Sequence, residues 1–150
     1  MYIATQLSIF MVNKPGILAQ ILAEFANAKI NITAVTVMDS VEHGVLRVVF
    51  ASKDKAEEVL SRLNMPFNKT DVLCVMLSNK SGALADVAEK LAKHHINISY
   101  AYCTAGARGG KTTGVLKVAD VKKAMRVLKP TGAVSSKSKP AVRRSKASRK

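Results

Sequence analysis

The sequence predicts an α+β protein made of two ferredoxin-like βαββαβ units, each with an antiparallel sheet and helices on one face, plus a disordered basic C-terminal tail. Two stretches of twenty residues match without gaps at an offset of 66 positions. Each stretch lies among segments that alternate between β-rich composition and helical periodicity. Residues 129–150 carry eight Lys or Arg and no acidic residue, so much of the net charge of +14 belongs to a tail.

The matching stretches are residues 13–32 and 79–98, and nine of their twenty positions are identical. The identical pairs are Asn13/Asn79, Lys14/Lys80, Gly16/Gly82, Leu18/Leu84, Ala19/Ala85, Ala26/Ala92, Ile30/Ile96, Asn31/Asn97 and Ile32/Ile98. An internal duplication predicts two copies of one structural unit. We therefore expect a first domain over residues 1–70, a second domain over residues 71–136 and the tail over residues 137–150.

The first half of each unit reads as strand, turn, helix and strand. The β-rich runs cover residues 2–12 and 71–78, and a Lys-Pro-Gly or Lys-Ser-Gly turn follows them. An apolar stripe at helical spacing then predicts a helix, with Pro15 or Ser81 near its start. The stripes are Leu18, Ile21, Leu22 and Phe25 in the first unit and Leu84, Val87, Ala88 and Leu91 in the second. The second strands are expected over residues 31–39 and 97–104.

The second half of each unit begins with a third strand, over residues 44–50 and 114–118. The near copies GVLRV and GVLKV in these strands have an offset of 70, which predicts four additional residues before the later strand. The stripes of the second helices are Ala56, Val59, Leu60 and Leu63, then Val121, Ala124, Met125 and Leu128. A fourth strand fits residues 66–70, and its weak counterpart falls near residues 132–136.

The stretch TAGARGGKTTG, residues 104–114, approaches a nucleotide-binding signature that ends in Gly-Lys-Thr. A phosphate loop must leave a strand and open a helix, because the amides of the helix N-terminus hold the phosphates. This stretch leads into a predicted strand instead, and Ala105 replaces the first glycine. We therefore predict an enlarged hairpin, in which Arg108 and Lys111 could still contact an anionic partner.

The composition argues against membrane, metal and catalytic functions. Apolar runs such as residues 72–77 are too short to span a bilayer, and the first residues show no secretory signal, so we expect a cytoplasmic protein. Cys74 and Cys103 lie on strands that a third strand separates, so we expect free thiols. His43, His94 and His95 lack a third ligand at suitable spacing, and no nucleophile has a paired base. No metal, no cofactor and no enzymatic activity are expected.

The duplicated turn is the candidate binding site. Its polar and small residues are Asn13, Gly16, Leu18 and Asn31 in the first unit and Asn79, Gly82, Leu84 and Asn97 in the second. Glycine lets a ligand approach the backbone, and amides at a helix N-terminus attract an anion. Asparagine side chains offer donors and an acceptor, so carboxylate and ammonium could both be satisfied. The alternative is local: the asparagines cap helices and the glycines only turn the chain.

Both units resemble ACT domains, the small-molecule sensing modules of amino-acid metabolism, over about residues 3–128. The resemblance rests on the strand, the Asn-Lys-x-Gly-x-Leu turn, the helix and the Ile-Asn-Ile sequence, each present twice. It implies a tandem pair that binds a free amino acid without catalysis, acts on a regulated metabolic enzyme and forms a homodimer. By motif position the ligand-binding residues would be Asn13, Gly16, Ile17, Leu18, Asn31, Asn79, Gly82, Ala83, Leu84 and Asn97.

The resemblance also bears on which amino acid is bound. Some members have a polar residue near the end of the first strand, where this chain has Met11 and Leu77, so an apolar ligand side chain is favoured. The rest of the side-chain pocket would draw on Val35, Tyr100 and Tyr102.

The alternative function is binding of nucleic acid or another polyanion. The ferredoxin-like plan also serves RNA-binding proteins, but the third strands here lack the aromatic pattern of those proteins. Only the basic tail supports this function, through weak, salt-dependent and nonspecific contacts.

Overall fold

The computed structural model describes residues 1–39, 43–104 and 111–129. The elements of the first unit are β1 (Tyr2–Val12), α1 (Ile17–Asn27), β2 (Ile32–Asp39), β3 (His43–Phe50) and α2 (Lys53–Arg62). Those of the second unit are β4 (Phe67–Ser78), α3 (Ala83–Lys93), β5 (Ile98–Cys103), β6 (Lys111–Val118) and α4 (Val121–Leu128). This order confirms the βαββα succession predicted for each unit. The predicted strand near residues 132–136 and the tail lie outside the described residues.

The strands form one six-stranded antiparallel sheet with the order β2-β3-β1-β4-β6-β5. The prediction of separate strands over residues 66–70 and 71–78 was wrong, because both belong to the continuous strand β4. No glycine or proline interrupts this strand, so nothing in its sequence forces a turn. The expected domain boundary after residue 70 therefore falls inside a strand.

The two units share their central strands. Thr5 of β1 pairs with Asp71 of β4, which is its own counterpart at the offset of 66, so the pairing has two-fold pseudosymmetry. The first half of β4 occupies the fourth-strand position of the first unit. The first half of β1, beginning at Tyr2, occupies that position in the second unit. Each unit is thus completed by a strand that also belongs to the other.

The third strands do not superpose as their sequences predict. Met11 of β1 pairs with Gly44, whereas its counterpart Leu77 of β4 pairs with Thr112 and not with Gly114. The structural offset is therefore 68, and the second unit has two additional residues before β6, not four. A slip of two residues keeps every side chain on its own face of the sheet, so the sequence match could not reveal it.

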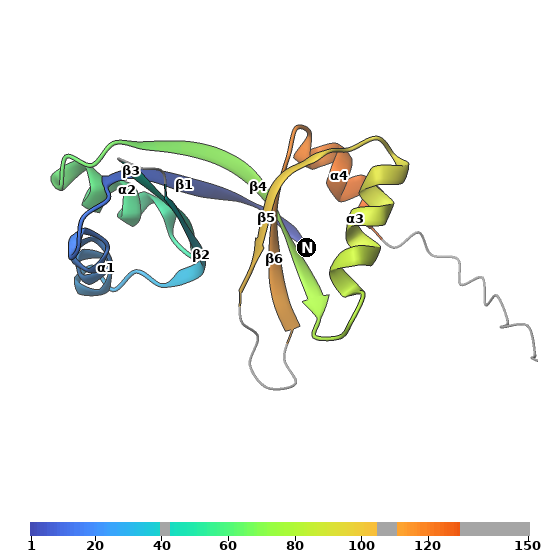
Figure 1. Ribbon diagram of the computed structural model, residues 1–150, viewed down its shortest axis with the longest axis horizontal. Coiled ribbons are helices and arrows are strands. Elements are labelled where there is room, and N and C mark those ends of the chain that lie inside the picture. The colour runs from blue at the N-terminus through green and yellow to red at the C-terminus, as the bar shows by residue number, and fades with distance from the viewer. Residues whose placement is uncertain (40–42, 105–110, 130–150) are drawn as a thin grey trace, which may run out of the picture.

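The four helices of the described residues cover one face of the sheet, as predicted. Leu7 and Ile9 of β1 share that face with Leu73 and Val75 of β4, because directly paired residues point to the same side. Helices α1 and α2 pack over the β1 half around Phe25, and α3 and α4 pack over the β4 half. Figure 1 shows the two helix pairs at opposite ends of a sheet that bends strongly between them.

The bend folds the helix-free face onto itself, so that the edge strands β2 and β5 come into contact. The enclosed apolar cluster contains Ala34, Val49, Val72, Cys74 and Val115. Gln6 is fully buried beside it and joins the two units. Its Nε2 donates to the Tyr100 hydroxyl over 2.8 Å, and its Oε1 accepts from the Tyr102 hydroxyl over 2.9 Å. Burial raises the pKa of Tyr102 above the usual range, with smaller contributions from neighbouring groups.

Two smaller predictions concern β5 and β6. The two strands are antiparallel neighbours, as expected of a hairpin, and Lys111 and Thr112 begin a strand and not the helix that a phosphate loop opens. Residues 105–110, with Arg108, lie outside the described part. Cys74 and Cys103 are free thiols, as expected, with β6 between their strands.

Among the described residues, no helix is long and apolar enough to cross a membrane.

Candidate ligand site

The two strand-to-helix turns have the same backbone geometry. Gly16 precedes α1 with φ 91° and ψ −21°, and Gly82 precedes α3 with φ 87° and ψ −14°. The hydrogen bonds also repeat: the amide of Lys14 donates to Val12 over 2.9 Å, and that of Lys80 donates to Ser78 over 2.8 Å. A Cβ atom at either glycine would have no heavy atom within 4 Å. Glycine is therefore needed for its left-handed backbone and not for space.

The second residue of each helix has an amide without a helical acceptor, and asparagine does not cap either helix. Gly16 and Gly82 are the N-cap residues, and neither helix has a side-chain capping hydrogen bond. The first helical bond of α1 runs from Gln20 to the Gly16 carbonyl, so the amide of Leu18 has no acceptor within the helix. The amide of Leu84 is in the same position in α3. Asn13 and Asn79 are exposed in the turns.

Asn31 and Asn97 lie at the opposite end of the sheet from their own turns. Ala34 of β2 lies level with Gln6 of β1, because both pair with Val49. Asn31 comes before Ala34 in the chain, whereas Asn13 comes seven residues after Gln6. Because β1 and β2 run parallel, the two asparagines lie on opposite sides of the level of Gln6 and Ala34. At about 3.3 Å per residue, the two side chains are more than roughly 20 Å apart. Within one unit, then, Asn31 does not join the turn that contains Asn13, and the repeat places Asn97 in the same way.

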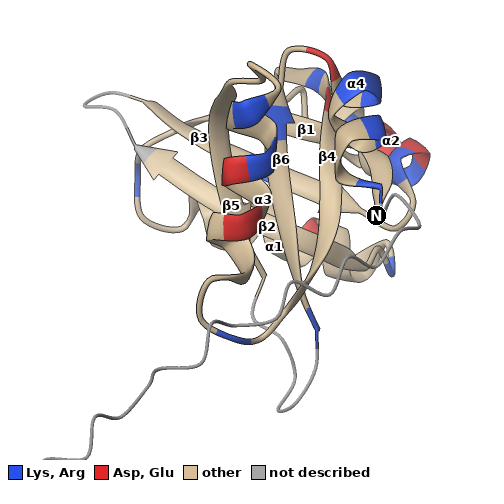
Figure 2. Cartoon of the chain, turned by 90° about the vertical axis from the view of Figure 1, so that its right-hand side faces the viewer, with Lys and Arg blue, Asp and Glu red and all other residues tan. Residues whose placement is uncertain are grey.

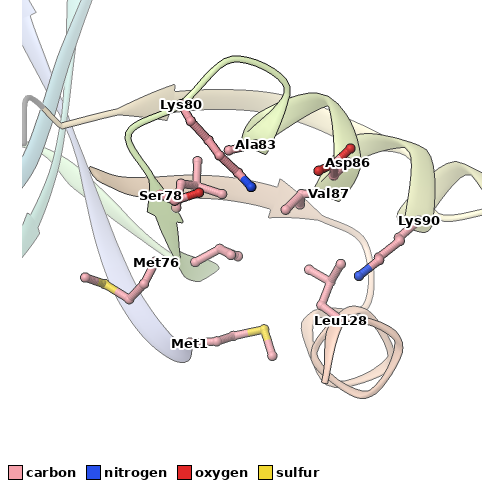
Figure 3. Close-up of a pocket in the computed structure, with 11 residues that line it drawn as sticks. Met1, Met76, Ser78, Lys80, Ala83, Asp86, Val87, Lys90 and Leu128 are labelled. Atoms are coloured by element: carbon pink, nitrogen blue, oxygen red, sulfur yellow. The ribbon is translucent and has the colours of Figure 1, made fainter. Parts of the chain in front are cut away.

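A cavity of about 450 Å³ opens beside the second turn, between the end of β4, the start of α3 and the end of α4. Its apolar wall includes Val75, Leu77, Val87 and Leu128. Its polar residues are Ser78, Lys80, Asp86 and Lys90. Figure 3 shows the side chains of Lys80 and Lys90 reaching toward the space between Ser78, Val87 and Leu128. This cavity can accept a small molecule with an apolar part and charged groups.

The first unit has the equivalent cavity, smaller and almost without charge. It measures about 300 Å³ and is lined by Phe10, Met11, Val12, Ile17, His43, Met65 and Pro66. Four of these residues are the repeat counterparts of Met76, Leu77, Ser78 and Ala83, which line the second cavity. The repetition at one offset identifies the same place in both units.

Only two of the ten predicted site residues line these cavities, Ile17 in the first and Ala83 in the second. Met11 lines the first cavity and Leu77 lines the second. Both were predicted to belong to the side-chain pocket. Tyr100 and Tyr102 lie on the helix-free face instead, where they bond to Gln6. The sequence did not identify the charged residues of the second cavity as site residues. Asp86, for example, lies off the apolar stripe of its helix, where side chains usually face solvent. Comparing the copies could have drawn attention to Asp86, because the first unit has Gln20 at that position. Ser78 likewise stands where the first unit has Val12.

The charge of the body is concentrated on the second unit. Residues 1–70 hold seven Lys or Arg and six acidic residues, whereas residues 71–129 hold ten and four. Figure 2 shows basic residues on α4, whereas α2 carries both signs. A net positive charge of this kind favours anionic over cationic ligands near the second unit. Within residues 1–39, 43–104 and 111–129, no cluster of three His, Cys, Asp or Glu could hold a metal ion.

Comparison with known proteins assigns the chain to a protein family. A family model described as an ACT domain pair matches residues 1–136. Protein BT0572 from Bacteroides thetaiotaomicron is 32% identical, with a TM-score of 0.78 over 85% of this chain and 87% of that one. The ligand-free regulatory subunit of aspartate kinase from Thermus thermophilus is 14% identical, with a TM-score of 0.60 over 85% and 95%, so it shares the fold. No curated protein sequence matches this chain. The chain belongs to the ACT domain pair family.

Proposed function

We propose that this protein is a non-catalytic sensor that binds a free amino acid beside its strand-to-helix turns and modulates an enzyme of amino-acid metabolism. The observation that carries the proposal is the cavity between the end of β4 and the start of α3, with charged groups above an apolar wall. A zwitterion with an apolar side chain complements both parts. The buried side chain of Leu77 in the wall favours such a ligand.

The family supports a regulatory role, and the neighbours point to the kind of partner. Solved proteins that share the fold include the regulatory subunit of aspartate kinase from Thermus thermophilus. An enzyme that uses or makes amino acids is therefore the partner we propose. The free amides of Leu18 and Leu84 and the exposed amide side chains of Asn13 and Asn79 supply further contacts for the polar end of a ligand.

A thermal-shift screen of the full chain against the twenty amino acids tests the proposal. A ligand that binds only the folded state adds about 2.7 kcal/mol of stability at one hundred times its dissociation constant. We expect a raised melting temperature with an apolar amino acid, a smaller shift with the corresponding amine and no shift with chloride. The absence of any shift at millimolar concentrations would contradict the sensor function.

We also propose that the protein is a homodimer, in line with the pairing that the ACT resemblance implies. Analytical ultracentrifugation at micromolar concentrations is expected to show a mass near twice the 16.1 kDa of one chain. A single species of one chain's mass, with and without amino acid, would contradict this.

Binding of RNA by the folded body finds no support in the arrangement of the sheet. Proteins of this general plan bind bases on the helix-free face, through exposed aromatic residues. Here Tyr102 on that face donates its hydroxyl proton to the buried Gln6 of the other half. Polyanion binding by residues 129–150 stays an alternative that depends on their charge alone.

A further inference from the structure

We propose that only the second unit binds the amino acid, and that three residues bind its charged groups: Lys80 of the duplicated turn, and Asp86 and Lys90 of α3. Asp86 binds the ammonium group, and Lys80 and Lys90 bind the carboxylate. This inference rests on the proposed function, because it assigns the residues and the stoichiometry of the same binding activity.

The first argument is the chemistry of the second cavity. The described side chains that line it include two cations and one anion, all three exposed, and the buried apolar side chains of Val75 and Leu77. A free amino acid carries one carboxylate and one ammonium group on the same carbon. Either group needs a charged or hydrogen-bonding partner when it leaves water, since an unpaired charge is costly to bury. The cavity offers both partners beside a surface for the side chain.

The second argument is the position of the three charges. Asp86 and Lys90 are one turn apart on α3, so their side chains lie on the same face of the helix, and both line the cavity. Lys80 reaches the same space from the turn before α3, and Figure 3 shows Asp86 between the two lysines along the chain. The ion pairs within the described residues are Lys69–Glu57 and Lys93–Glu89, so none of these three charges is paired with another. They remain available to a ligand.

The third argument is that the chain contains its own comparison. At the counterpart positions the first unit has Lys14, Gln20 and Glu24, none of which lines its cavity. Ile17 stands where the second unit has Ala83, and its three additional carbons fill part of the space. Val12 stands where the second unit has Ser78 and removes a hydroxyl group. Among the described residues that line it, the first cavity therefore offers a zwitterion an apolar wall without an anion for its ammonium group.

Isothermal titration calorimetry on the full chain tests the assignment. The probes are L-leucine, L-isoleucine, L-valine, L-methionine and L-phenylalanine, followed by the N-acetyl and amide derivatives of the tightest of them. We expect one ligand per chain. Asp86→Asn and Lys80→Gln should each weaken amino-acid binding about tenfold or more, which is typical for loss of a charge-assisted contact.

The derivatives show whether each residue reads the group assigned to it. The N-acetyl derivative has no ammonium group, so Asp86→Asn should leave its affinity unchanged. The amide has no carboxylate, so Lys80→Gln and Lys90→Gln should leave its affinity unchanged. The matched controls are Gln20→Asn and Lys14→Gln at the same places in the first unit, and both should bind as the natural chain does. All five positions are exposed, so the variants are expected to fold normally.

The outcomes separate the two proposals. Two ligands per chain, or equal losses in Lys14→Gln and Lys80→Gln, would overturn the assignment to the second unit while leaving the sensor function in place. Binding of the amino acid that Asp86→Asn does not weaken would overturn the role of Asp86. No binding of any probe to the natural chain would overturn the sensor function for apolar amino acids and this inference together.

Discussion

A fragment of residues 71–150, expressed without the first unit, is expected to show no cooperative unfolding transition. In the full chain, Tyr2 to Thr5 pair with one edge of β4, so the fragment would lose the strand that completes its sheet. It would also expose Val72 and Cys74, which are fully buried against the other half. A unit of about 60 residues is marginal even with an intact core, because it buries too little surface. The loss therefore approaches the whole stability of a typical domain, about 5–15 kcal/mol.

Urea unfolding followed by circular dichroism compares the fragment with the full chain. Mixing it with a fragment of residues 1–70 should restore part of the native signal, because the missing half of β1 is then supplied in trans. If the isolated fragment unfolded in a steep transition, at a urea concentration near the midpoint of the full chain, the second unit would instead fold independently of residues 1–70.

Replacing Gln6 with alanine is expected to lower the free energy of unfolding by about 2–4 kcal/mol, from lost hydrogen bonds and a cavity. Gln6 is fully buried and accepts the hydrogen bond of Tyr102 while donating to Tyr100 and Ser8. Its removal leaves the hydroxyl of Tyr102 without this acceptor. The guanidinium of Arg47 lies 3.9 Å from the centre of the Tyr100 ring. This contact would also weaken, because Gln6 no longer holds the Tyr100 hydroxyl in place.

A double-mutant cycle separates the hydrogen bond from the cavity. Tyr102→Phe removes the donor, so Gln6→Ala combined with Tyr102→Phe should cost less than the sum of the two single changes. Ser8→Ala is the control, since it removes one contact of Gln6 near the edge of the network and should cost about 1 kcal/mol or less. Strict additivity of Gln6→Ala and Tyr102→Phe in denaturant unfolding would refute the proposed network between the units.

Local pattern in the sequence determined each unit. The stripes at Ile21 and Phe25, the glycines before the helices and the alternation along β1 each specify short-range structure, and the offset of 66 specified two copies. The choice between hairpin and phosphate loop also followed from what comes next in the chain. These features depend on backbone preference and on the face a side chain presents, which neighbouring residues settle.

The tertiary structure alone decided how the copies combine. Whether β4 runs through residue 70 depends on its partner β1, which is distant in sequence, and the two-residue slip of β6 leaves the pattern of faces unchanged. The sequence grouped Asn13 with Asn31, but parallel strands place them at opposite ends of the sheet. Asp86 is exposed, and only the tertiary structure shows that it borders a cavity, because α3 and α4 together enclose space beside β4. Such relations arise from packing between segments far apart in the chain, and local periodicity contains no information about them.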